Sequence, residues 1–154
     1  MPYISSADRS YVTRSIDEFI RSLPSFLNLT TELLTSELVK VVRDFATGQS
    51  NHALSQHYPG IGFKLKSYGE LNFFLTKVLF RYVLNRCDFQ MSYTFIALFT
   101  GIVEQIKKQV GDTTAEVSGT LENVKQEFYA RAARKYEDGK IRQNGDIPEY
   151  ALLG

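Results

Sequence analysis

Residue types that support catalysis or cross-linking are scarce in this chain. It has no tryptophan and one cysteine, Cys87, so an internal disulfide is excluded. The two histidines, His52 and His57, lie five positions apart with too few nitrogen or sulfur ligands nearby for zinc. A lone thiol with no base close to it in sequence is typical of an incidental cysteine. We therefore expect no cofactor and no metal site, and a reducing, cytoplasmic location.

Long apolar runs and an excess of one charge are also missing. The most apolar stretch, Phe95 to Val103, is too short to span a bilayer. Residues 1–4 lack a basic region followed by an apolar run, so no signal peptide is expected. The formal net charge is only +1, and no helix-turn-helix pattern stands out. We expect neither a membrane partner nor specific DNA readout.

Helical periodicity dominates what is present. The 154 residues, 44% of them hydrophobic, suit a single helical domain over residues 1–154. The spacing of apolar residues predicts an all-α bundle of about five helices, which begin near Ser6, Thr31, Ser67, Ser92 and Thr113. A capping box, Ser67 with Glu70, gives the clearest helix start. The residues expected in the core include Leu75, Leu79, Phe99, Leu121 and Phe128.

Two regions break this regularity. Glycine and proline punctuate residues 48–66, which predicts an irregular arm, and Ile61, Phe63 and Leu65 alternate as in one short strand or an extended loop. At the other end, Asp138-Gly139 and Asn144-Gly145 predict two turns in a turn-rich C-terminal tail. We expect this tail to fold back onto the bundle or a neighbouring subunit, anchored by Tyr136 and Ile141.

Apolar helix faces indicate self-association. The helix from Ser92 is apolar nearly all round, so it belongs in the middle of a bundle or in an oligomer interface. The helix over 113–135 keeps a long seam through Val117, Leu121, Val124, Phe128 and Ala132. The leading hypothesis is therefore a non-enzymatic interaction protein that forms a homo-oligomer, most simply a two-fold dimer.

A basic and aromatic cluster near the tail supports an alternative, the binding of a small anionic ligand such as a nucleotide or phosphate. Arginine and tyrosine can hold such a ligand by charge and stacking. The candidate ligand-binding residues are Tyr129, Arg131, Arg134, Tyr136, Glu137 and Asp138. Arg131 or Arg134 is expected to lie near Glu137 or Asp138.

An internal echo gives a third hypothesis. Residues 100–107 resemble residues 118–125 at an offset of 18, or five helical turns, which makes Glu104 and Glu122 equivalent. Two facing carboxylates could hold a metal, as in a carboxylate-metal nucleotide hydrolase, but the i, i+3 Glu/His motif of such sites is missing.

Several short motifs resemble those of a family of small bacterial and phage proteins with no assigned activity. The motifs lie at residues 1–4, 69–72, 127–129, 136–138, 140–141 and 144–146, with the letters MPYI, GELN, EFY, YED, KI and NGD. The chain departs from the family pattern in having Ala130 where a second basic residue is typical, and a longer stretch over 24–66. The segments at Gly101 and Gly119 also look like one family segment present twice. The resemblance implies no particular function.

Overall fold

A computed structural model of the chain describes residues 4–26, 28–50, 61–86, 93–111 and 114–153. Within these ranges every regular element is a helix, which confirms the all-α expectation. Cys87, His52 and His57 lie outside the described residues.

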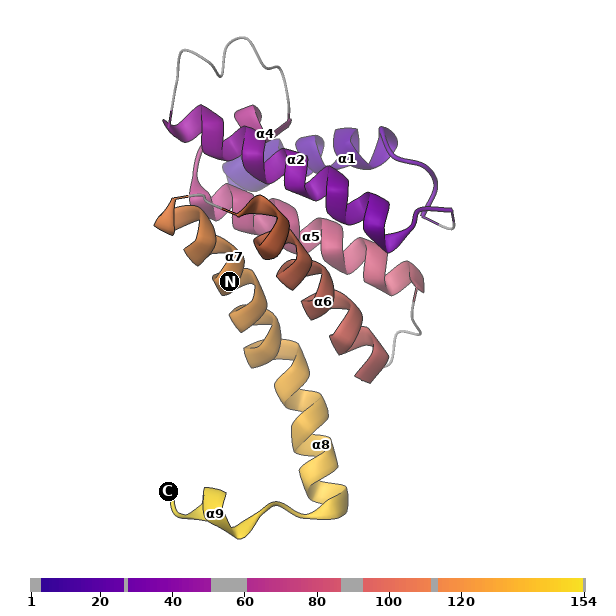
Figure 1. Cartoon of the computed structure of the whole chain (residues 1–154), viewed down its shortest axis with the longest axis vertical. Helices are drawn as coiled ribbons and strands as arrows, with labels where there is room; N and C mark the ends of the chain where they lie inside the picture. The colour runs from indigo at the N-terminus through magenta and orange to yellow at the C-terminus, as the bar shows by residue number, and fades with distance from the viewer. Residues whose placement is uncertain (1–3, 27, 51–60, 87–92, 112–113, 154) are drawn as a thin grey trace.

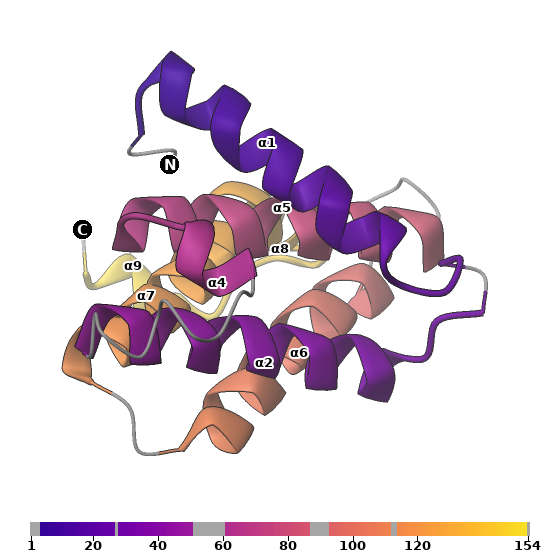
Figure 2. The same cartoon turned by 90° about the horizontal axis from the view of Figure 1, so that it is seen from above.

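Five long helices form the bundle, as the periodicity predicts. They are α1 (Ser6–Arg21), α2 (Thr31–Ser50), α5 (Tyr68–Arg86), α6 (Tyr93–Val110) and α7 (Ala115–Phe128). Helix α5 packs against α1, α6 and α7, while α2 packs against α6 (Figures 1 and 2). All five residues expected in the core are buried, each with at most 3% of its surface exposed.

The helix starts follow from side-chain capping. Ser67 Oγ accepts a hydrogen bond from the Glu70 N–H at 3.2 Å, as the capping box predicts. In a capping box the Glu70 side chain would accept from the Ser67 N–H. Here the buried Glu70 carboxylate accepts instead from the N–H of the preceding residue, Lys66, at 2.9 Å. Thr114 caps α7 in the same way through the Val117 N–H at 3.3 Å.

The expected strand or extended loop around Ile61 is wrong. Helix α2 continues past Gly48 to Ser50, and Ile61–Lys64 form one helical turn, α4. This turn packs on α2 so closely that Gly62 has no room for a side chain there. Tertiary contact has therefore overridden an alternation that spans only three apolar residues. Residues 51–60 of the expected irregular arm lie outside the described part of the chain.

The expected turn at Asp138-Gly139 is also wrong. Helix α7 runs on through a π-helical turn, η1 (Tyr129–Ala133), into α8 (Arg134–Asn144). Gly139 lies within α8. The helix ends at the second expected turn, Asn144-Gly145, where Gly145 has a φ of 82°. A short helix, α9 (Pro148–Ala151), follows.

Residues 134–153, which we call the C-terminal arm, project away from the bundle (Figure 1). Tyr136 packs at the edge of the core, but α8 buries none of its residues and Ile141 is 40% exposed. The expected docking of this segment on its own bundle is therefore wrong. Polar side chains fill most of α8, so little apolar surface is available to hold it there.

Packing within the chain explains why α6 is so apolar. Its buried apolar residues are covered by α2, α5 and α7, so α6 lies in the middle of the bundle, the first of the two expected alternatives. The seam of α7 is likewise buried, against α5. The buried faces of α6 and α7 are therefore used for packing within the chain.

Candidate functional site

The six candidate ligand residues do not form one site. Tyr129 borders a hollow beside α6, next to Tyr93 and Thr100. Arg131 turns the other way, toward α5, and pairs with Glu127 rather than with Glu137 or Asp138. Arg134, Glu137 and Asp138 are exposed along α8, and Tyr136 is half-buried at its start.

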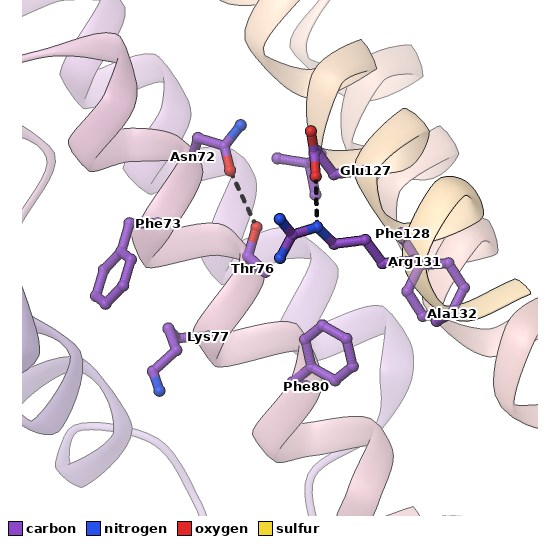
Figure 3. A pocket seen from close by; sticks show the side chains of 10 residues that line it. Asn72, Phe73, Thr76, Lys77, Phe80, Glu127, Phe128, Arg131 and Ala132 are labelled. Carbon is purple, nitrogen blue, oxygen red and sulfur yellow. Dashed lines mark hydrogen bonds and ion pairs between the residues drawn. The ribbon is translucent and has the colours of Figure 1, made fainter. Parts of the chain in front are cut away.

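A cavity lies between α5 and the junction of α7 with η1, and we call it the α5–η1 groove (Figure 3). Its volume is about 310 Å³. The apolar walls are Phe73, Phe80, Val124, Phe128 and Ala132, and the polar rim is Asn72, Thr76, Lys77, Glu127 and Arg131. A mainly apolar cavity with a few polar groups at its edge is the usual form of a binding site.

The π turn shapes one wall of this groove. Its i→i+5 bonding adds a residue to the turn, so the consecutive residues Ala132 and Ala133 both reach the buried face. Ala132 lines the groove beside Phe128, and its small side chain leaves room there. The same turn keeps Arg131 over Glu127, with 3.1 Å between Nε and Oε2. Turns of this kind are frequent at functional sites.

The rim carries a small positive charge. Lys77 is exposed, with its ammonium group 5.8 Å from the centre of the Phe73 ring. Lys77 and Arg131 are basic and Glu127 is acidic, so the rim residues sum to a net charge of +1. On the α5 side, Thr76 Oγ1 donates to Asn72 Oδ1 at 3.2 Å (Figure 3). The groove therefore suits an apolar group that carries a negative charge.

The carboxylates of the internal echo face lysines instead of each other. Lys107 Nζ lies 2.5 Å from Glu122, and Lys125 Nζ lies 2.8 Å from Glu104, so the two equivalent pairs are reciprocal. The hydrogen bond from Lys107, aided by Gln126, lowers the pKa of Glu122 to about 2. Within the described residues, no three His, Cys, Asp or Glu side chains come together as a metal site.

Another hollow, of about 320 Å³, follows one side of α8. It is bordered by Lys135, Tyr136, Gly139, Lys140 and Gln143, all from this one helix. The Lys140 ammonium lies 5.6 Å from the centre of the Tyr136 ring. A ligand here would touch the protein from one side only, so this surface is a weaker binding site than the α5–η1 groove.

The end of the C-terminal arm is the most apolar exposed segment in the described chain. We call residues 146–153 the tip. Ile147 and Tyr150 are 54% and 60% exposed, and Leu152 and Leu153 are 85% and 81% exposed. Large apolar side chains grouped at this level of exposure mark an interaction surface.

Of the residues that line the groove, Arg131 alone is among the candidates for ligand binding that the sequence indicates. Asn72, Thr76 and Lys77 belong to α5, more than fifty positions earlier, and nothing in their local pattern links them to Arg131. The tip could have been found, because four large apolar residues after Gly145 follow a helix with a polar surface.

Comparison with known families places part of this region in context. A family model described as "Domain of unknown function (DUF6899)" matches residues 90–147, which include α6, α7, η1 and α8. This is consistent with the resemblance to proteins of no assigned activity, and it extends over both echo segments. No curated protein and no solved structure matches the chain. Among the described residues, the helices are not long and apolar enough to cross a bilayer.

Proposed function

We propose that this chain is a non-enzymatic helical protein that associates with a second copy through its C-terminal arm. The observation that carries this proposal is the exposure of the arm: α8 and α9 bury none of their residues, and the tip exposes four large apolar side chains. Helix α8 continues from α7 through η1 but buries no residue of its own. A partner surface would supply the packing that the arm lacks.

The size of the tip suggests a low affinity. Burying a leucine side chain contributes about 1.5–3 kcal/mol, so Leu152 and Leu153 of two arms supply roughly 6–12 kcal/mol before the costs of association. Those costs are about 4–15 kcal/mol, and Tyr150 and Ile147 add to the gain. The gains and costs are thus of similar size, and we expect a weak dimer that dissociates on dilution.

Amide hydrogen exchange at about 1 µM and 100 µM tests this proposal. The amides of residues 134–153 should become more protected at the higher concentration, because the partner covers them. Exchange in this segment that is equally fast at both concentrations would contradict the proposal.

A pair of tyrosine variants provides the control. Tyr150→Ser should abolish the concentration dependence, whereas Tyr93→Ser should leave it intact. Tyr93 is 71% exposed, more than Tyr150, but belongs to α6 and not to the arm. If Tyr93→Ser alone abolished the concentration dependence of amide exchange, the interface would lie on α6 instead.

A small anionic ligand is the second candidate, and the favouring observation is the hollow on α8 with its two lysines and Tyr136. Phosphate or ATP should then raise the melting temperature. The increase should disappear in a Lys135→Gln, Lys140→Gln double variant. A nucleotide hydrolase is not proposed, because Glu104 and Glu122 are paired with Lys125 and Lys107.

A further inference from the structure

We infer that the α5–η1 groove is the receptor for the tip of a second copy, so that two chains exchange their C-terminal arms. This inference rests on the proposed self-association and names the surface that it uses. The groove needs an apolar occupant with negative charge, and the tip has that chemistry. Residues 144–154 contain Asp146 and Glu149 and no lysine or arginine, whereas the groove rim has a net charge of +1.

The positions of groove and tip along the arm are consistent with a closed dimer. The groove lies at the root of the arm, at residues 128–132, and the tip lies at its far end. If two equal arms run antiparallel, each tip reaches the root of the other arm. The same contact then forms twice about a two-fold axis, and no open surface remains to extend the assembly.

The point midway between root and tip is near Gly139 on α8, where the two helices would cross. Gly139 has no side chain, which lets the two helices approach closely.

The same helix keeps the tip away from the groove of its own chain. Helix α8 has 11 residues, so it separates root and tip by about 16 Å at 1.5 Å per residue. Figure 1 shows α8 running straight away from the bundle, with α9 at its far end. In the described conformation, a second copy is therefore the source of a tip that can reach the groove.

Charge reversals at Lys77 on the groove and Glu149 on the tip, made in the full-length chain, test whether the tip binds in the groove. Lys77→Glu on the groove and Glu149→Lys on the tip should each weaken the dimer by about fivefold, because each change acts at two symmetric contacts. The double variant should recover most of the affinity of the unmodified chain. Lys108→Glu, an equal charge change on the exposed end of α6, should have little effect. Additive losses in the double variant would overturn the assignment of the groove.

Photo-cross-linking identifies the surface directly. The photoreactive residue benzoylphenylalanine replaces Tyr150, and isotope-labelled chains are mixed with unlabelled chains before irradiation. Cross-links between labelled and unlabelled chains at residues 72–80 or 124–132 are the expected result. Cross-links between chains at other residues would overturn the groove while leaving self-association intact. Cross-links within one chain only would overturn the exchange. A monomer that gives no cross-link would refute both proposals together.

Discussion

Gly62 is the position where one added methyl group should do most damage. A Cβ atom there would lie 2.4 Å from the Val41 carbonyl oxygen, 2.7 Å from the Phe45 nitrogen and 2.8 Å from the Asp44 Cβ. All three distances are below those of ordinary van der Waals contact, and two of the three neighbours are backbone atoms. Neither α2 nor α4 can absorb the methyl group by turning a side chain. Gly62→Ala must therefore push the two helices apart.

The sign of the effect distinguishes packing from helix propensity. At Gly101 and Gly119 nothing lies within 4 Å of the added Cβ, so alanine should stabilise the protein there by about 0.5–1 kcal/mol. At Gly62 the overpacking should outweigh this gain and destabilise the protein by about 1–3 kcal/mol. The same chemical change should thus move stability in opposite directions, with a difference of about 2–4 kcal/mol.

Urea unfolding followed by circular dichroism measures this difference. Gly62→Ala and Gly101→Ala should be compared with the unmodified chain at one protein concentration, since association also contributes to stability. A stabilising Gly62→Ala would mean that α4 does not pack on α2 as described. A destabilising Gly101→Ala would mean that the exposed face of α6 is covered.

Other substitutions test the core, a cap, an ion pair and the arm. Phe128→Ala should cost about 3–5 kcal/mol in urea unfolding, because the Phe128 and Phe99 rings stack with centroids 4.0 Å apart; a loss below about 1 kcal/mol would refute this packing. Thr114→Ala should cost about 1 kcal/mol through the lost α7 cap, and an unchanged midpoint would contradict the cap. Because the pKa of Glu122 is lowered from 4.5 to about 2, its contribution is fully present above pH 4.5 and is lost as the pH falls toward 2. This exposed group should contribute less than about 1 kcal/mol, and Glu122→Gln should remove that part of the acid sensitivity measured by thermal melting. Gly139→Ala should raise the helical signal at 222 nm, whereas a turn at this position would lose stability.

The helices and their starts could be predicted because their signals are local. Apolar spacing identified the buried faces of α5 and α7, and Ser67 with Glu70 marked the start of α5. The turn signal at Asp138-Gly139 failed for a related reason. Its neighbours are good helix formers, and the preceding helix continues into them, so a helical glycine costs only about 1 kcal/mol.

The site could not be predicted to the same extent, because it depends on how helices cross. Arg131 was identified from its own neighbourhood, but the groove needs Lys77 and Phe80 from α5 beside it. The echo showed that Glu104 and Glu122 are equivalent, yet their partners were found only once α6 and α7 were seen to pack with Lys107 and Lys125 between them. Contacts across helices carry information that periodicity along one helix does not.

Sedimentation velocity of the unmodified full-length chain from about 0.5 to 100 µM is the most direct test of arm-mediated self-association. The mass should rise with concentration from that of the 17.6 kDa monomer toward twice that value. It should then remain at the dimer, since two exchanged arms leave no further surface free. A mass of 17.6 kDa throughout the range would contradict self-association. A mass that grows past the dimer would contradict the closed exchange of arms.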